Sequence, residues 1–460
     1  MGGQSDRTVA DLTALMAATP PSAFTGAASA GDDYLPTSGN GGYAVLSYEL
    51  DLDYRVATNR LNGTARIRAR STMPLERFSL DFAGLSVVKV TVDGERPRKL
   101  AETPRKLVIT LDRALDADTD FTVEVRYRGA PHPIRSPWGE VGWEELADGV
   151  IVAGQPSGAA SWFPCNDHPS DKATYRITVA CEAGYTVVSN GPLVSRVNRS
   201  GRTIWTFEMR QPMATYLATV QIGRYRSQQL GAPVGAAPQT LFYPPAIERD
   251  VMIDFGRVPE MMALFCEQFG PYPFESYSVV VTPDELEIPL EAQGLAVFGR
   301  NHIDGAHGTD RLIAHELAHQ WFGNSLTLAQ WRDIWLHEGF ACYSEWLWAE
   351  ASGGKTADQS AAWYRAEVNA QPKDIVIGDP GPRAMFDDRV YKRGALALHA
   401  VRRALGDAVF FPSLQAYVAE CRFGLVSTED FVEIMEARSG SDAVGELVER
   451  WVYGRALPKL

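Results

Sequence analysis

A short run of histidine and glutamate in the second half of the chain constrains its fold more than any other feature. His315, Glu316 and His319 form an H-E-x-x-H sequence within a helix-forming segment, Arg311 to Phe322. Residues four apart lie on one face of an α-helix, so both imidazoles can bind one metal ion while Glu316 lies beside them. The sequence therefore predicts a helix that supplies two metal ligands and a candidate general base.

A third ligand must come from elsewhere, because zinc in a hydrolytic site takes three protein ligands and keeps one position for water. Glu338 is the best candidate, since eighteen residues separate it from His319. That length allows one helix to end, a turn to follow, and a second helix, predicted over 333–348, to return antiparallel. Glu345 lies two turns beyond Glu338, where it can accept a hydrogen bond from a ligand imidazole. The pattern predicts one Zn2+ ion per chain, bound by His315, His319 and Glu338.

Charge and cysteine usage narrow the class of protein. The 460 residues carry a formal net charge of −13, which argues against nucleic acid or an anionic membrane as a partner. The five cysteines are scattered and odd in number, which is a poor basis for a disulfide framework. The N-terminus lacks the pattern of a signal peptide, and no run of about eighteen apolar residues occurs. We therefore expect a cytoplasmic protein with reduced thiols that binds neither nucleic acid nor membrane.

Hydrophobic patterning divides the chain into three parts. Residues 1–42 are rich in Ala, Ser, Gly and Pro, with one helical possibility at 9–17, and are expected to form an N-terminal arm. Residues 43–228 contain many short alternating runs, which predict an antiparallel β domain whose first hairpin turns at Asn62-Gly63. Residues 229–460 are mainly helical in pattern and contain the metal motif. The predicted fold class is α+β.

Several further elements are expected around the metal motif. Residues 287–298, just upstream, predict one exposed edge strand, because Pro289 cannot donate to a sheet ladder. Downstream, helices are predicted over 351–371 and 393–405, with a loop rich in Pro, Asp and Gly between them. Two more amphipathic helices are expected to follow, ending near residue 453.

The segment that contains Glu338, W-L-H-E-G-F-A over residues 335–341, resembles the gluzincin aminopeptidases, the family that includes aminopeptidase N and leukotriene hydrolase. His337 stands where that family usually has Asn, beside the ligand and not in its place. The resemblance runs from about residue 43 to the end. It implies a saddle-like β domain followed by a thermolysin-like catalytic domain, in a short two-domain bacterial-type form without the long C-terminal helical domain of larger relatives.

Three other segments resemble the family and imply roles. Residues 155–173 follow its Q-x-x-x-A-x-x-x-F-P-C-x-D-x-P-x-x-K-A signature, in which the opening glutamine, here Gln155, helps to bind the terminal amine of the substrate. Residues 288–292 depart from the family's G-A-M-E-N but retain its glutamate as Glu291. The resemblance implies that Glu291 is a second partner for that amine. Tyr391 begins a sequence like the family's Y-x-K-G and implies a hydroxyl that steadies an oxyanion.

Together these residues predict a zinc aminopeptidase acting on a peptide or aminoacyl amide with a free N-terminus, with Glu316 as general base. The residues leave three alternatives open: a thermolysin-like endopeptidase, a dedicated amide hydrolase on the same zinc centre, and a catalytically silent binding module. Epoxide hydrolysis belongs to a branch of the family with a helical C-terminal domain, for which the sequence has no counterpart.

Overall fold

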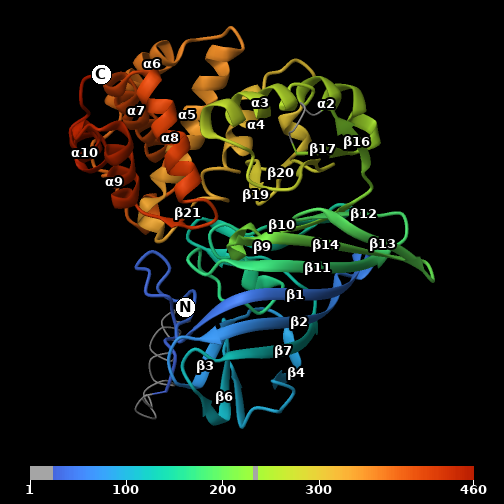
Figure 1. Ribbon diagram of the computed structural model, residues 1–460. Helices are drawn as coiled ribbons and strands as arrows, with labels where there is room; N and C mark the ends of the chain where they lie inside the picture. The colour runs from blue at the N-terminus through green and yellow to red at the C-terminus, as the bar shows by residue number, and fades with distance from the viewer. Residues whose placement is uncertain (1–23, 232–236) are drawn as a thin grey trace, which may run out of the picture.

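The computed structural model describes residues 24–231 and 237–460. Figure 1 shows a β-rich part, blue to green, next to a mainly helical part, yellow to red. Strands between 43 and 230 precede helices between 248 and 453, which confirms the predicted fold class. The division predicted after residue 228 falls within strand β16, Arg226–Leu230. The helix suggested at 9–17 lies outside the described residues.

The largest sheet has seven strands in the order β13-β14-β11-β1-β2-β7-β4. Most neighbours are antiparallel, as predicted, but β1 and β11 run parallel, with Ser47 opposite Thr174 and Asp53 opposite Ala180. The sequence pattern did not reveal this pair, because side chains alternate between two faces with either strand direction. The strands are β1 Tyr43–Arg55, β2 Arg60–Ser71, β4 Ser86–Val92, β7 Asp120–Gly129, β11 Ala173–Glu182, β13 Leu193–Arg199 and β14 Arg202–Met213.

The first hairpin turns before the predicted Asn62-Gly63. A short 3-10 turn, Val56–Thr58, joins β1 to β2, and Asn59 takes the left-handed conformation with φ 44°. Gly63 instead lies inside β2, where an added Cβ would come within 2.2 Å of the Tyr127 ring. The glycine therefore makes room for an aromatic side chain of the neighbouring strand, and the turn signal was wrong for that physical reason.

Two smaller sheets complete the β-rich part. One has the order β3-β6-β5 and the other β12-β15-β10-β9-β8. Their strands are β3 Leu75–Asp81, β5 Lys99–Glu102, β6 Lys106–Leu115, β8 Ile134–Ser136, β9 Gly139–Leu146, β10 Gly149–Ala153, β12 Thr186–Ser189 and β15 Val220–Gly223.

The helical part begins with a five-stranded sheet in the order β16-β17-β18-β20-β19. The strand predicted over 287–298 is in fact a hairpin, β19 and β20, that turns at Gln293 and Gly294; β19 is the edge strand, as expected, and Pro289 lies just outside it. The remaining strands are β17 Gln239–Tyr243, β18 Tyr277–Val281, β19 Leu290–Ala292, β20 Leu295–Phe298, β21 Thr327–Leu328 and β22 Leu425–Val426.

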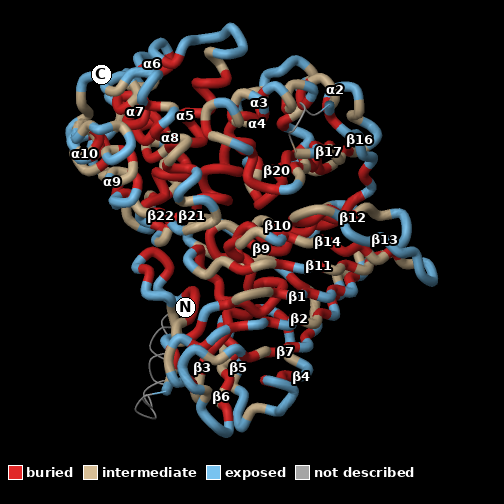
Figure 2. The backbone as a smooth tube through the Cα atoms, viewed as in Figure 1, coloured by how far each residue is buried: buried red, intermediate tan, exposed pale blue. Residues whose placement is uncertain are grey.

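Helices cover this sheet and form the rest of the domain (Figure 1). They are α2 Glu248–Asp254, α3 Val258–Phe269, α4 Asp310–Ala318, α5 Trp335–Ala351, α6 Ala357–Ala370, α7 Asp388–Leu405, α8 Asp407–Glu420, α9 Thr428–Ser439 and α10 Ala443–Val448. Three helices follow α7 where two were predicted. Figure 2 shows α5 almost wholly buried, and every residue from Trp335 to Trp348 is buried. A helix that is apolar on nearly all sides belongs in the centre of a domain. None of the described helices has the length and hydropathy to span a membrane.

The two parts of the molecule share one continuous hydrophobic core, which extends from Tyr34 to Val452. A polar contact reinforces the junction: the Lys172 ammonium, from the start of β11, donates to the carbonyl oxygens of Ser325 at 2.9 Å and Asn324 at 3.2 Å. Both carbonyls belong to the loop that follows α4. The β domain therefore helps to fix the loop that closes the metal motif.

Candidate metal centre

The two metal-motif helices pack against each other as predicted. His315 and Glu316 lie on α4, His319 stands at its C-terminal end, and Glu338 lies in the first turn of α5. The regular helix ends at Ala318 and not at Phe322, because the N–H groups of Gln320 and Trp321 bond to carbonyls three residues back. From Asn324, whose N–H bonds to the His319 carbonyl at 3.0 Å, the bonds reach five residues back. This wider turn brings the chain round to α5 in a short distance.

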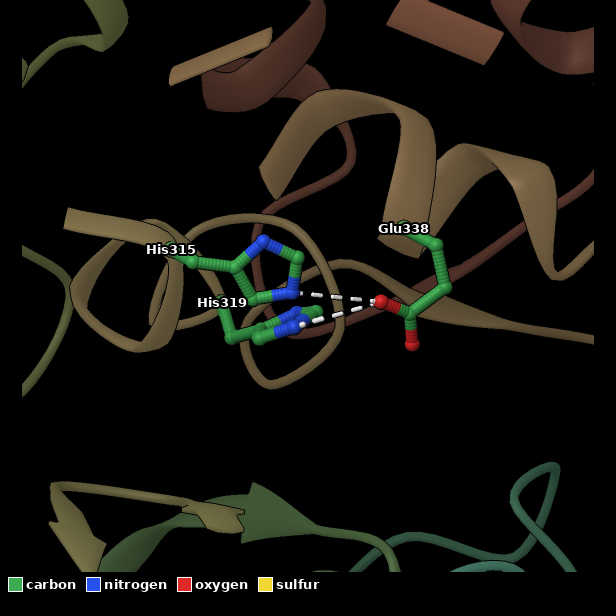
Figure 3. Close-up of side chains that lie close together, drawn as sticks. All are labelled: His315, His319 and Glu338. Carbon is green, nitrogen blue, oxygen red and sulfur yellow. Dashed lines mark ion pairs between the residues drawn. The ribbon is translucent and has the colours of Figure 1, made fainter. Parts of the chain in front are cut away.

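The three predicted ligands converge on one point (Figure 3). The Nε2 atom of His315 lies 3.4 Å from Oε2 of Glu338, and Nε2 of His319 lies 3.6 Å from the same oxygen. Zinc bonds of about 2.0–2.2 Å place two tetrahedral ligand atoms about 3.3–3.6 Å apart. The ligand atoms of the three residues all lie within 4.8 Å of one another, so their spacing suits a zinc ion.

Hydrogen bonds on the far side of each imidazole leave the Nε2 atoms available. His315 Nδ1 lies 2.8 Å from Oε1 of Glu345, which confirms the predicted support for a ligand histidine. His319 Nδ1 lies 3.0 Å from the Phe322 carbonyl oxygen. Each Nδ1 therefore donates a hydrogen bond, and each Nε2 faces Glu338 and the candidate metal position.

Buried carboxylates crowd this centre. Glu291, Glu316 and Glu338 all lie close to the two histidines, and Oε2 of Glu316 is buried without a hydrogen-bond partner. Burial, with Glu338 and Glu345 nearby, raises the pKa of Glu316 to about 7. Burial, with Glu338 and Glu316 nearby, raises the pKa of Glu291 well above its usual range. A divalent cation would offset this concentration of negative charge, so the donor set fits a zinc ion in charge as well as in spacing.

The two histidines differ in their protonation. Burial lowers the pKa of His319 to about 4, so its imidazole is neutral and ready to bind a metal. Burial also opposes a charge on His315, but its hydrogen bonds to the carboxylates of Glu338 and Glu345 outweigh that effect and raise its pKa to about 10. Metal binding must therefore displace a proton from His315.

The two predicted amine-binding residues touch each other. Gln155 comes from the β domain and Glu291 from the edge strand β19, and Nε2 of Gln155 donates to Oε1 of Glu291 at 2.6 Å. Candidate ligand atoms of Glu291, Glu316 and His319 also lie within 4.8 Å of one another. The contact between the domains thus places the Gln155–Glu291 pair directly beside the metal position.

Two residues that the sequence reasoning missed position this edge strand. Gln320 receives a hydrogen bond from Gly294 N at 2.8 Å and donates to the Ala292 carbonyl at 3.1 Å. Asn324 donates to the same carbonyl at 3.0 Å. Gln320 directly follows H-E-x-x-H, and Asn324 directly follows Gly323. Their amide side chains near the metal motif were the available signal. They link β19, and with it Glu291, to the end of the metal helix.

Tyr391, on α7, packs over the metal centre. Its ring lies 6.1 Å from the His315 ring with an angle of 17° between the planes. The helices α5 and α7 approach closely at two glycines, since an added Cβ on Gly339 would lie 2.9 Å from Gly394 Cα. The glycines of the two predicted motifs therefore allow the close crossing that brings Tyr391 to this position.

Charged residues surround Glu345 behind the metal centre. Arg311 donates to Oε2 of Glu345 at 3.0 Å, and Lys392 Nζ lies 4.0 Å from the same oxygen. Burial disfavours the charge of Glu345, but His315, Lys392 and Arg311 together hold its pKa below the usual value. Glu345 is therefore a fixed anion that supports His315.

His337 has a structural contact only. Its Nε2 accepts a hydrogen bond from the Leu328 N–H at 3.0 Å, and burial keeps its pKa well below the usual value. The neutral imidazole thus supports the loop between the metal helices, as an amide oxygen would at the same position.

Together, the paired helices, the two imidazoles with one carboxylate and the neighbouring glutamates define a metallopeptidase-type centre on a two-part α+β fold. Comparison with known families assigns the chain more closely. The description "Peptidase M1 N-terminal domain" matches residues 44–217, and "Peptidase family M1 domain" matches residues 254–451. The chain belongs to peptidase family M1.

Solved and curated relatives agree with this assignment. The M1 zinc metallopeptidase of Deinococcus radiodurans, solved as a mutant bound to a Tyr-Ser-Ala substrate, is 31% identical with a TM-score of 0.86, and the match covers 94% of this chain and 98% of that one. Tricorn protease-interacting factor F2 of Thermoplasma volcanium is 28% identical over 68% of this chain. Human endoplasmic reticulum aminopeptidase 1 is 26% identical over 87% of it. The matches span only 42% and 46% of the lengths of these two curated relatives.

Proposed function

We propose that the protein is a zinc-dependent aminopeptidase that removes the first residue from peptides or aminoacyl amides. One observation carries the proposal: Glu291, hydrogen-bonded to Gln155, lies within 4.8 Å of Glu316 and His319. A substrate ammonium bound by this carboxylate would have its first peptide bond at the metal centre. His315, His319 and Glu338 would hold the zinc ion.

The chain's own side chains divide the chemistry among them. When bound, zinc supplies Lewis acidity that lowers the pKa of water and polarises the scissile carbonyl. Glu316 takes a proton from the attacking water and returns it to the leaving amine, as a carboxylate beside the metal position can. The Tyr391 hydroxyl donates a hydrogen bond to the oxygen on which negative charge develops.

The amine site distinguishes this proposal from an endopeptidase. The Gln155 amide donates to one oxygen of Glu291, so the other oxygen is available to a substrate ammonium. The surroundings of Glu291 disfavour its ionised form, and a cationic partner that donates a charge-assisted hydrogen bond would stabilise that form. An internal peptide bond has no ammonium to provide that stabilisation. We also propose that the enzyme acts in the cytoplasm, which fits its five free cysteines.

Paired substrates test the proposal. Each fluorogenic aminoacyl amide is offered with a free and with an acetylated amine, to the parent and to Glu316→Gln. We expect cleavage of the free-amine series only, and a loss of several powers of ten in kcat for Glu316→Gln with its zinc content unchanged. Glu350→Gln, at the far end of α5, is the matched control. Rapid cleavage of the acetylated series would instead favour the endopeptidase alternative.

A further inference from the structure

A cavity lies behind the metal centre. It has a volume of about 270 Å³ and opens between the first turn of α4, the second half of α5 and helix α6. Six of its lining residues matter to its chemistry: Arg311, Glu345, Trp348, Lys355, Trp363 and Tyr364. Glu345 separates it from the metal centre, because one carboxylate oxygen contacts His315 and the other contacts Arg311.

The two cationic side chains of this cavity, Arg311 and Lys355, have N–H donors that are available to a ligand. Lys355 is exposed and, within the described residues, forms no ion pair; its ammonium lies 4.7 Å from the Trp363 ring centre. Arg311 has a side chain that is 51% exposed and uses Nη1 to reach Glu345. A guanidinium carries five N–H donors in a planar fork, so several of them remain available to an anion.

The acidic side chains are already paired. Asp310 contacts Arg257 at 3.3 Å and His307 at 3.2 Å. Glu345 accepts from both His315 and Arg311. Neither carboxylate is therefore free to bind a cationic ligand. The charged groups that remain available in the cavity are the hydrogen-bond donors of Arg311 and Lys355. This asymmetry selects an anion.

Aromatic rings form the rest of the wall. Trp363 is 47% exposed, and its ring meets Tyr364 edge to face at 4.8 Å. Tyr364 is itself stacked on Trp346 at 5.3 Å with 6° between the planes. One exposed tryptophan is ordinary on a protein surface, but here it borders a cavity next to two cations. A flat apolar group is the natural partner for such a surface.

We propose that this cavity binds a small aromatic carboxylate. The carboxylate would pair with Arg311 and Lys355, and the ring would pack against the exposed part of Trp363. The volume of about 270 Å³ lies just below the range for drug-sized ligands, which begins near about 300 Å³, so one or two fused rings fit and a peptide does not. Of the residues that line this cavity, the proposed zinc site uses Glu345, which contacts His315, and Arg311, which contacts Glu345; it uses neither Lys355 nor Trp363.

Calorimetric titration of the zinc-loaded protein with benzoate and with its neutral counterpart benzamide tests the site. We expect saturable binding of benzoate that is at least about tenfold tighter than that of benzamide, because a charge-assisted hydrogen bond is lost with the amide. Lys355→Met, which keeps the length of the side chain, should weaken benzoate binding by about the same factor. Trp363→Ala should weaken both ligands, because it removes the ring surface.

The controls separate this cavity from the metal centre. Lys89→Met, a surface lysine on β4, should leave benzoate binding unchanged. Lys355 and Trp363 lie outside the proposed catalytic machinery, so hydrolysis of a free-amine substrate should be unchanged in both variants and shows that they are folded. The proposal is overturned if benzoate does not bind at millimolar concentration, if benzamide binds equally well, or if neither Lys355→Met nor Trp363→Ala weakens benzoate. The last result would place the bound carboxylate at the metal centre.

Discussion

Replacing Glu345 by glutamine tests how strongly the surroundings of a ligand imidazole control metal affinity. In the parent, Glu345 accepts from His315 Nδ1 at 2.8 Å and from Arg311 at 3.0 Å. An amide can serve one of these donors but not both, because its NH2 group must then face the other. If the amide oxygen accepts from His315, the amide NH2 faces the Arg311 guanidinium, and two donors then oppose each other. If the amide group is rotated, its oxygen accepts from Arg311 and His315 loses its acceptor.

The expected loss follows from that conflict. Substitution of such a supporting group costs about 10–100-fold in metal affinity, equivalent to about 1.4–2.7 kcal/mol. We place Glu345→Gln in the upper half of this range, because a buried donor is left facing a guanidinium as well. The protein should still fold and still bind zinc at high concentration.

Chelator competition measures this loss directly, as the zinc dissociation constant of each variant at one pH. Glu350→Gln is the matched control, because it is the same substitution on the same helix. Glu350 contacts Arg402 at 3.6 Å and Ala357 N at 3.2 Å, away from the metal centre. It should bind zinc as the parent does. The reasoning fails if Glu345→Gln binds zinc within about twofold of Glu350→Gln.

Three further predictions address the substrate and the fold. Tyr391→Phe should keep its zinc and lose about a hundredfold in kcat, the effect of one missing oxyanion donor; a twofold loss would make it a packing residue. Glu291→Ala should lose at least about tenfold in kcat/KM on a free-amine substrate and much less on an acetylated one, and equal losses would contradict an ammonium site. Burial and Asp81 raise the pKa of Asp167 to about 7, so the folded protein holds a proton that the unfolded chain loses near pH 4. The resulting stability is complete below that pH and disappears as the pH rises to about 7, so the urea midpoint should fall more between pH 5 and 7 in the parent than in Asp167→Asn.

The arrangement of the candidate ligands was predictable because it is local. One helical turn places His315 and His319, and a short connection to the next helix makes Glu338 the best third candidate. The same holds for Glu345, two turns beyond Glu338. The roles of Gln155, Glu291 and Tyr391 required resemblance to a family, because they come from three distant segments.

Contacts between distant segments were what the sequence did not reveal. Asn62-Gly63 has the composition of a turn, yet Gly63 is needed beside Tyr127 in the next strand. Likewise, the residues around Lys172 do not indicate that its side chain donates to carbonyl oxygens in the loop after α4. At such positions the residue type depends on a contact with a segment that is distant in the sequence, so no local sequence pattern predicts it.

The parallel pairing of β1 with β11 also sets an order for folding during synthesis. The last residue of β1, Arg55, leaves the ribosome well before the first residue of β11, Ala173. At about 5–20 residues per second, that interval is roughly 6–24 seconds. During it, β1 can pair with β2, but its other edge has no native partner and must stay unpaired or be covered. A nascent chain stalled just before β11 should therefore be cleaved by protease within β1, and a chain stalled after β14 should be protected there; equal protection of both would mean that another segment covers the edge first.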